Sequence, residues 1–528
     1  MNPATSVLLH ATQRPEARAM VCDDVVQTYG ELHDRSQRLA NALHGLGLAP
    51  GDCIALLVGN GPSTLEQIVA VSAAGMVRAP LYGHDPASRH EYLLGLTRAR
   101  ALIIDEGYLE PLEPLLTSCP DLAHVVVVGD GEVARSAVQR GVAHAYHPLV
   151  EAAGSDPVMV DYAPDDHYQI RFSAGTTGFP KGILHDVAGW MAAGDQIAEI
   201  LEEPLGTHSC YLAAGPLTHA ATMPVWPVLA AGGSIVVMSS FDAGRFLQLI
   251  ETHQVTLSLV VPAMVQALAA HPEAATRDLS SLQAVYYGTS PMPEATLRSG
   301  LALWGNIMYQ VYGQSEALPA TALLPRDHIV DGTPVERGRL RSAGRPLESC
   351  GVRILGPDDQ ELPVGEVGEI VIQSAGRMRE IWGDPEATAE RITEDGWVRT
   401  RDMGRFDEDG FLFLADRKED MIISGGYNIW PAELENALTN HPAVVEAAVV
   451  GVPHPRWGET PHAVVVLDPA AEPPSEDDLI QWTREQVGSV KKVTTVTFAE
   501  ALPRSPVGKI LRRALREDRT PSDSPSSP

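Results

Sequence analysis

The sequence has few of the features that mark secreted, membrane-spanning or zinc-stabilised proteins. Its 528 residues include five cysteines, and these stand far apart without a CxxC pair, which argues against a disulfide framework and a structural zinc site. No stretch approaches the roughly 18 uninterrupted apolar residues of a membrane span, and the N-terminus lacks the basic and then apolar pattern of a signal peptide. We therefore expect a soluble, cytoplasmic protein without a membrane span.

Positive charge is also scarce. The formal net charge is -29, and no basic stripe is interleaved with aromatic residues, so nucleic acid is excluded as a partner. Lysine is rarer still, because only five of the 39 basic residues are lysines. Two of the five, Lys181 and Lys509, lie in glycine-marked segments, and this placement makes them candidates for a function.

The pattern of apolar residues predicts an α/β fold with a large multi-layer N-terminal domain. Short β-rich runs such as residues 53–58, 124–130 and 284–290 alternate with amphipathic helical stretches. Two alternating runs near the C-terminus predict a separate, small α+β domain. We expect the domains to span residues 1–415 and 421–516, with a hinge at 416–420 and a disordered tail at 517–528.

A glycine-rich turn follows the predicted strand HYQIRF at 167–172. The segment FSAGTTGFPKGI brings glycines, hydroxyl groups and Lys181 into a short turn that can point N–H groups, hydroxyls and an ammonium at one polyanion. It is not a Walker loop, because Pro180 precedes the lysine and Gly182 follows it. A loop that is merely rich in glycine and threonine is the alternative interpretation.

FSAGTTGFPKG closely resembles the [Y/F]TSGTTGxPKG signature of the ANL superfamily of adenylate-forming enzymes. This superfamily comprises acyl-CoA synthetases, luciferases and the adenylation domains of peptide synthetases, and its large α/β domain carries a small mobile C-terminal domain. The resemblance implies that the phosphates of ATP bind to Ser173, Thr176, Thr177 and Lys181.

Further segments resemble the motifs of this superfamily in the expected order between residues 172 and 516. GPLTHA resembles PLxHxxG, which implies that His219 borders the acyl pocket, although a lone histidine is more often a core residue. The segments YYGTSPMP and QVYGQSEA resemble the adenine loop and the YGxTE motif. The nucleotide-binding residues that they imply are Gly288, Thr289, Ser290, Tyr312, Gly313 and Ser315.

Three motifs imply the metal, ribose and catalytic contacts. Glu316 ends the YGxTE motif and is expected to bind Mg²⁺, because a carboxylate beside a triphosphate needs a bridging hard cation. GWVRTRDMG resembles GWxxTGDxG, which implies that Asp402, together with Arg417, binds the ribose hydroxyls. LPRSPVGKILRR resembles the segment that supplies the late catalytic lysine, here Lys509.

The resemblance implies a two-step ligase that uses ATP, Mg²⁺ and coenzyme A. A carboxylate attacks the α-phosphate, and a thiol then displaces AMP. ISGGYNIWPAELE resembles the segment that lines the pantetheine tunnel, which assigns Gly425, Gly426 and Tyr427 to coenzyme A. The C-terminal domain rotates between the steps about a pivot that aligns with Glu419.

The acid substrate is expected to be hydrophobic. His219, Met223, Trp226, Gly288 and Val311 predict a pocket for an aliphatic, alicyclic or aromatic acid. A peptide-synthetase adenylation domain is disfavoured, because PLTHAAT lacks the aspartate that anchors an amino acid and because no carrier domain follows. Coenzyme A is therefore preferred to an acyl carrier protein as the thiol partner. Both a monomer and a homodimer are compatible with the family.

Two substitutions depart from the family motifs. Ala174 replaces a serine in the phosphate loop, and Arg401 replaces the glycine beside the ribose aspartate. They motivate an alternative in which the protein adenylates poorly and forms thioesters from a preformed acyl-adenylate. Glu316 and Lys509 both persist, which argues against this alternative and against a binding protein without catalysis.

Overall fold

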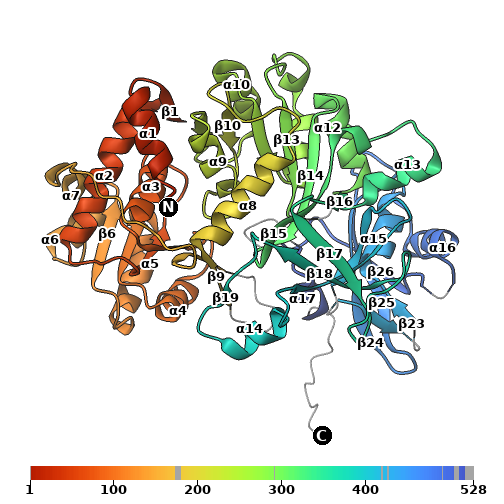
Figure 1. The fold of residues 1–528 in the computed structure, drawn as a ribbon. Helices are drawn as coiled ribbons and strands as arrows, with labels where there is room; N and C mark the ends of the chain where they lie inside the picture. Colours follow the sequence, from red (N-terminus) through yellow and green to blue (C-terminus); the bar gives the residue numbers. More distant parts are fainter. Residues whose placement is uncertain are drawn as a thin grey trace, which may run out of the picture.

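The computed structural model of the chain describes residues 2–172, 180–290, 292–417, 420–424, 427–489, 491–504 and 510–517. Within them the fold is mixed α/β, with a large N-terminal domain and a smaller C-terminal domain, as predicted (Figure 1). None of the helices in these ranges combines the length and apolar character that a membrane crossing requires. All five cysteines are free, as their spacing predicts.

An eight-stranded sheet forms the core of the lobe at the left of Figure 1. Strands β3 to β8 pair in parallel, and β8, β9 and β19 pair antiparallel at one edge. In spatial order the strands are β19 (Glu380–Ile381), β9 (Gly182–Asp186), β8 (His167–Phe172), β4 (Val77–Pro80), β3 (Cys53–Leu57), β5 (Ala101–Asp105), β6 (His124–Val128) and β7 (His144–Ala145).

A nine-stranded sheet forms the second lobe. Its central strands are parallel, and β13 is buried along its whole length, as expected for a strand covered on both faces. In spatial order the strands are β16 (Arg345–Pro346), β15 (Ala317–Leu323), β14 (Met308–Gln314), β13 (Ala284–Gly288), β12 (Leu257–Val260), β10 (Cys210–Ala213), β11 (Ser234–Val237), β1 (Arg18–Cys22) and β2 (Val25–Thr28).

Two smaller antiparallel-rich sheets complete the fold. The four-stranded sheet contains β17 (Cys350–Leu355), β18 (Gly368–Ser374), β20 (Val398–Phe406) and β21 (Leu412–Arg417). The five-stranded sheet belongs to the C-terminal part and contains β22 (Ile422–Ser424), β23 (Tyr427–Ile429), β24 (Val444–His454), β25 (Gly458–Leu467) and β26 (Thr495–Phe498).

The helices cover and separate these sheets. In chain order they are α1 (Thr5–Gln13), α2 (Tyr29–Gly45), α3 (Thr64–Ala73), α4 (Ala87–Thr97), α5 (Glu106–Leu112), α6 (Glu132–Gln139), α7 (Tyr146–Ala152), α8 (Val187–Glu199), α9 (Val225–Ala230), α10 (Ala243–His253), α11 (Pro262–Ala269), α12 (Glu294–Trp304), α13 (Pro334–Gly338), α14 (Pro385–Arg391), α15 (Pro431–Thr439), α16 (Glu476–Val487) and α17 (Arg512–Glu517).

Helix α8 lies between the two large lobes, as Figure 1 shows. Its buried residues Trp190 and Ile197 share one hydrophobic cluster with Tyr168 of β8 and Tyr286 of β13. The same helix begins directly after β9, which pairs with β8, so the chain passes from the predicted phosphate turn into the centre of the molecule. The site residues on both lobes therefore meet across α8.

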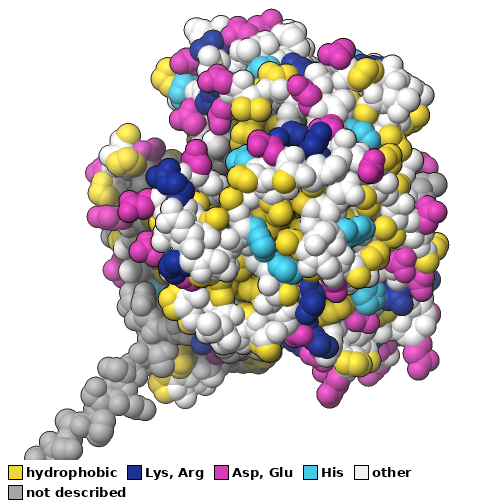
Figure 2. Space-filling view, turned by 90° about the vertical axis from the view of Figure 1, so that its left-hand side faces the viewer, with side chains coloured by type: hydrophobic (Ala, Val, Ile, Leu, Met, Phe, Trp, Pro, Cys, Tyr) yellow, Lys and Arg dark blue, Asp and Glu magenta, His cyan; other side chains and the backbone are white. Residues whose placement is uncertain are grey.

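Figure 2 shows how charged side chains are distributed on one face of the molecule. On the face that Figure 2 shows, Lys and Arg side chains form small, separate groups among scattered Asp and Glu, and no broad basic area is present there. This distribution does not match the phosphate backbone of a nucleic acid.

Candidate functional site

The loop that carries His219 is fixed from the neighbouring lobe. Asn60, which follows β3, donates from Nδ2 to the carbonyl oxygen of Gly215 at 2.9 Å and accepts from the Leu217 N–H at 2.8 Å. Arg78 of β4 donates to the Leu217 carbonyl oxygen at 2.8 Å. These residues were not predicted from the sequence, because polar contacts between segments so far apart leave no local pattern.

Tyr82 holds the ring of His219. Its Oη lies 2.6 Å from Nδ1, and the two rings meet edge to face. Burial raises the pKa of Tyr82 to about 12, so its phenol keeps the proton and can donate to Nδ1. The histidine at the predicted pocket border therefore has a defined orientation.

The predicted pocket residues lie close together. Met223 and Trp226 are buried in the hydrophobic cluster that contains Trp190, and Val311 packs against the same cluster. Val311 is also the register partner of Gly288 across β13 and β14. The structure thus gathers Met223, Trp226, Gly288 and Val311 next to α8, with the side chains of this region packed against one another.

The end of β13 has backbone features that explain its residue types. A Cβ atom on Gly288 would lie 2.4 Å from the Val311 carbonyl oxygen, so only glycine fits. Thr289 follows with φ of 66°, a left-handed conformation that is costly for a β-branched residue. Backbone strain of this kind concentrates at functional sites, and Thr289 lies in the predicted adenine loop, directly before Ser290.

Asp402 is the centre of a hydrogen-bond network on β20. Its Oδ2 accepts from the Tyr312 hydroxyl at 2.8 Å and from Gln314 Nε2 at 2.5 Å. The Tyr312 ring is itself buried in a hydrophobic cluster with Ile370. On the backbone, Asp402 is the register partner of Arg417, so the two predicted ribose residues occupy paired positions.

Arg401 stands where the backbone favours glycine. Its φ is 61°, in the left-handed region, which explains why the family motif has glycine at this position. Its guanidinium pairs with Glu390 at 3.2 Å, and its backbone N–H donates to Glu369. The departure from the motif therefore strains the backbone beside the predicted ribose site.

Glu316 is paired with a cation from the chain itself. Its Oε1 lies 2.9 Å from Nη2 of Arg391, and both side chains are 11% exposed. The same Nη2 also donates to Gln314. No group of three or more metal-binding side chains occurs within the described ranges, so the donor set fits Mg²⁺ carried by substrate phosphates and one carboxylate. Such a cation needs Arg391 to leave Glu316.

The peptide that precedes Glu316 is supported by a buried histidine. His185 of β9 donates from Nε2 to the carbonyl oxygen of Ser315 at 2.7 Å. Burial, reinforced by the charge of Arg171, lowers the pKa of His185 to about 3, so the ring is neutral. His185 thus fixes Ser315, a predicted nucleotide residue, without adding charge.

Lys181, the phosphate-binding lysine of the prediction, has an acidic neighbour. Its Nζ lies 3.1 Å from Asp384 Oδ2, and both side chains are close to half exposed. Asp384 also caps α14 by accepting from the Ala387 N–H. Helix α14 therefore pairs with two predicted site residues. Asp384 at its N-terminus pairs with Lys181, and Arg391 at its C-terminus pairs with Glu316.

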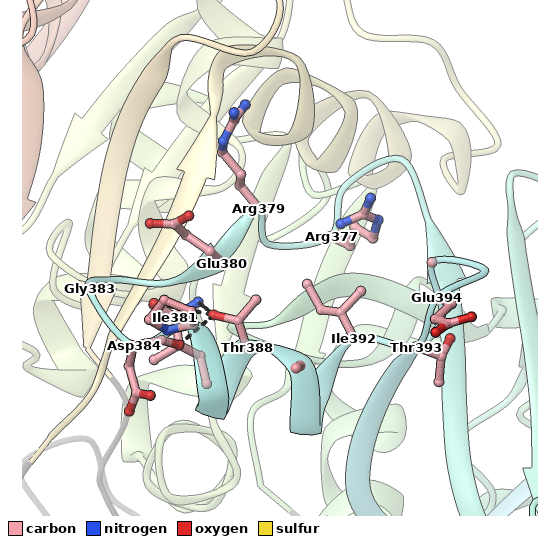
Figure 3. Close-up of a pocket in the computed structure, with 13 residues that line it drawn as sticks. Arg377, Arg379, Glu380, Ile381, Gly383, Asp384, Thr388, Ile392, Thr393 and Glu394 are labelled. Carbon is pink, nitrogen blue, oxygen red and sulfur yellow. Dashed lines mark hydrogen bonds between the residues drawn. The ribbon is translucent and has the colours of Figure 1, made fainter.

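A cavity of about 470 Å³ lies beside this helix (Figure 3). In Figure 3, Arg377 and Arg379 lie above Ile381, Asp384 and Thr388. Arg379 is one of its polar lining residues, and Asp384 connects the cavity to Lys181. The predicted acyl-pocket residues do not line this cavity. Its lining combines charged residues with apolar ones such as Ile381 and Ile392.

Several predicted site residues lie outside the described ranges. They are Ser173, Thr176, Thr177, Glu419, Gly425, Gly426 and Lys509. The side chains of Arg417 and Tyr427 are likewise outside the description. Gly313 is described and lies near the end of β14, where an added Cβ would collide with the Ala317 carbonyl oxygen at 2.7 Å. The roles assigned to these residues stay predictions.

Comparisons with known proteins agree along most of the chain. The AMP-binding enzyme family model matches residues 9–382, and the AMP-binding enzyme C-terminal domain model matches residues 433–509. A feruloyl-CoA synthase of Amycolatopsis sp is 36% identical over 511 residues, which cover 96% of each chain. The fatty acid–[acyl-carrier-protein] ligase ScoC of Streptomyces coeruleorubidus is 34% identical over 96% of this chain and 94% of that protein. The amide bond synthetase McbA from Marinactinospora thermotolerans has a solved structure that matches with a TM-score of 0.86 and 29% identity, over 98% of this chain and 99% of that chain.

Proposed function

This chain belongs to the AMP-binding enzyme family of ATP-dependent, AMP-forming ligases, and from that premise we propose that it activates a hydrophobic carboxylic acid as an acyl-adenylate and transfers it to coenzyme A. It is an acyl-CoA ligase with ATP, Mg²⁺ and coenzyme A as its reactants and cofactor. The main support for a coenzyme A product is the similarity to feruloyl-CoA synthase over 96% of both chains. We propose an aromatic acid of the size of ferulate as the first candidate substrate.

The described residues support a division of labour in the first half-reaction. Lys181 would exchange Asp384 for the triphosphate, and Asp402 would accept hydrogen bonds from the ribose hydroxyls. Glu316 would hold the Mg²⁺ that offsets the negative charge of the phosphates. His219, oriented by Tyr82, would border the acid at the end of the hydrophobic pocket. Lys509 would reach the α-phosphate from the C-terminal domain.

An acid panel tests this proposal. Ferulate, benzoate and decanoate would each be incubated with ATP and Mg²⁺, first for acid-dependent pyrophosphate exchange and then with coenzyme A for thioester detection by mass spectrometry. We expect exchange and thioester with at least one acid, and loss of exchange in Lys181→Met. Absence of both products with every acid, from folded protein, would refute the function.

The acceptor thiol has a second candidate. Similarity to a fatty acid–[acyl-carrier-protein] ligase favours a phosphopantetheine arm as an alternative acceptor. The same assay with a phosphopantetheinylated carrier protein in place of coenzyme A compares the two thiols. A higher kcat/KM for the carrier protein would move the assignment to that acceptor.

The alternative with weak adenylation rests on the two motif departures, Ala174 and Arg401. Ala174 lies outside the described residues, and Arg401 has a left-handed backbone beside Asp402. It predicts rapid thioester formation from a supplied acyl-adenylate and little pyrophosphate exchange. We favour the complete two-step reaction because Lys181, Glu316 and Asp402 are all retained. Exchange that equals the rate of thioester formation would exclude the alternative.

The domain division stays part of the proposal. We propose that residues 421–516 rotate relative to 1–415 about Glu419. Support comes from α17, where Arg512 and Arg516 both pair with Asp420, the first described residue after this position. Glu419→Pro should impair one half-reaction much more than the other, and equal effects on both would refute the pivot.

A further inference from the structure

Arg171, the second-last residue of β8, is a buried cation without a hydrogen-bond acceptor. Its side chain is 4% exposed, and its guanidinium lies over the ring of Trp190 at 5.8 Å. Nη1 is buried and has no hydrogen-bond partner. Across the part of the chain that the structure describes, no carboxylate forms an ion pair with Arg171.

Two neighbouring side chains also present donors without acceptors. Arg78 donates to Gln169 Oε1 at 2.9 Å, yet Arg78 Nε and Gln169 Nε2 are buried without partners. Gln169 and Arg171 are two positions apart on β8 and therefore share a face of the strand. The region has a surplus of buried N–H groups and two positive charges.

Such an arrangement costs stability unless a ligand completes it. A buried donor without an acceptor loses its hydrogen bonds to water, and a buried charge without a counter-charge costs more. Arg171 could be replaced by an apolar residue of similar length without losing any hydrogen bond within the described chain. Retention of the guanidinium therefore points to an anionic ligand.

The position of Arg171 identifies which anion. Glu316 lies close enough for its charge to act on the guanidinium, and the hydroxyl of Tyr82, which holds His219, is another neighbour. Arg171 thus lies near both the histidine at the predicted pocket border and the carboxylate predicted to bind Mg²⁺. The phosphate turn begins two residues later, at residue 173. The acid substrate must place its carboxylate in this interval to reach the α-phosphate.

We propose that Arg171 binds the carboxylate of the acid substrate and positions it for adenylation. This inference rests on the proposed function and names Arg171 as the residue that binds the acid. One carboxylate oxygen forms the new bond to the α-phosphorus, the bond from that phosphorus to the bridging oxygen breaks, and pyrophosphate leaves with the electron pair. A guanidinium matches a carboxylate with two parallel N–H bonds, so it fixes the attacking oxygen as well as its charge.

A binding experiment tests the charge preference. Titration calorimetry would compare ferulate with its neutral primary amide, or the best acid of the panel with its amide, on wild-type protein and on Arg171→Met. We expect wild type to prefer the carboxylate and the variant to bind it about 10- to 100-fold more weakly, as loss of a charged hydrogen bond predicts, with little change for the amide. Equal weakening of both ligands would overturn the proposal.

A kinetic experiment separates the two half-reactions. In Arg171→Met, KM for the acid in pyrophosphate exchange should rise, while thioester formation from supplied feruloyl-adenylate should stay near the wild-type rate, because the mixed anhydride has no free carboxylate. Arg171→Lys should restore part of the exchange. Arg337→Met, a change of an exposed arginine on α13, serves as the control and should match wild type. Equal loss in both half-reactions would overturn the assignment.

Thermal unfolding provides a readout that does not depend on turnover. Because Arg171 lacks an acceptor, Arg171→Met should leave Tm unchanged or raise it. A fall in Tm of several degrees would assign Arg171 a structural role and overturn the proposal. If wild-type protein turns over no acid, the proposed function fails, whereas the calorimetric preference for a carboxylate over its amide still decides the role of Arg171.

Discussion

Removal of the Arg391 guanidinium should expose the metal-binding capacity of Glu316. In Arg391→Gln the carboxylate loses a partner at 2.9 Å while it stays largely buried. Breaking one side of a buried ion pair costs about 3–5 kcal/mol. For a chain of this length, 1 kcal/mol corresponds to about 1 °C in Tm, so the variant should unfold about 3–5 °C below wild type when nucleotide and metal are absent.

The same variant should respond more strongly to Mg-ATP than wild type does. Under the role proposed for Glu316, Mg²⁺ has to displace the Arg391 guanidinium in wild type, whereas this ion pair is absent from the variant. We expect Mg-ATP to bind about tenfold more tightly to the variant, equivalent to about 1.4 kcal/mol, and at saturation to remove about 1.4 °C of the difference in Tm. Differential scanning fluorimetry over a Mg-ATP titration measures both quantities.

Arg401→Gln is the matched control. Arg401 pairs with Glu390 at 3.2 Å, but the two side chains are 38% and 60% exposed, so the pair should contribute no more than about 1 kcal/mol. The Tm of Arg401→Gln should stay within about 1 °C of wild type. The prediction is wrong if Arg391→Gln is as stable as Arg401→Gln, or if Mg-ATP stabilises Arg391→Gln and wild type equally.

Three other predictions follow from the site. His185 is neutral in the folded protein, where its pKa is about 3. Below about pH 6.5 the histidine of the unfolded chain binds a proton and that of the folded chain does not. The free energy of unfolding therefore declines by up to about 1.4 kcal/mol per pH unit as pH falls. His185→Gln keeps the donor and should flatten Tm between about pH 7 and 5; an unchanged slope would contradict this. Asp384→Asn keeps the helix cap and removes the carboxylate charge beside Lys181, so KM for ATP should fall up to about fivefold, and a rise in KM would count against a competing role of Asp384. Gly288→Ala places a methyl group 2.4 Å from the Val311 carbonyl oxygen and should lower Tm. Gly95→Ala is the control, because nothing lies within 4 Å of the added methyl group, and its Tm should not fall. Equal Tm values for the two variants would show that the ends of β13 and β14 move apart to accept the methyl group.

The repeating patterns of the sequence were sufficient to predict the strands around the site. The run HYQIRF matches β8 at 167–172, and the strand expected at 284–290 corresponds to β13. The prediction of two alternating strands in the C-terminal part is also confirmed by β24 and β25. Strand periodicity is local, and buried parallel strands have an almost continuous apolar pattern that survives without knowledge of their neighbours.

The partners of the site residues could not be predicted in this way. Arg391 is 75 residues from Glu316, and Asp384 is 203 residues from Lys181, so neither contact produces a pattern in the sequence. Arg171 was part of an expected strand, but its isolation from any acceptor depends on the three-dimensional packing against Trp190. The φ of 61° at Arg401 likewise explains the departure from glycine only once the backbone is known.

Helix α14 pairs with both of the charged residues to which we assign the phosphates and the metal. The Asp384 carboxylate pairs with Lys181, which we propose binds phosphate. The Arg391 guanidinium pairs with Glu316, which we propose binds the metal. Mg²⁺ alone would displace the Arg391 guanidinium from Glu316 without providing a new anion for Arg391. Nucleotide without Mg²⁺ would displace the Asp384 carboxylate from Lys181 without providing a cation for Glu316. With the roles proposed for Lys181 and Glu316, the two exchanges would balance only when metal and nucleotide arrive as one species, so this short helix would favour the Mg-ATP complex over its separate components.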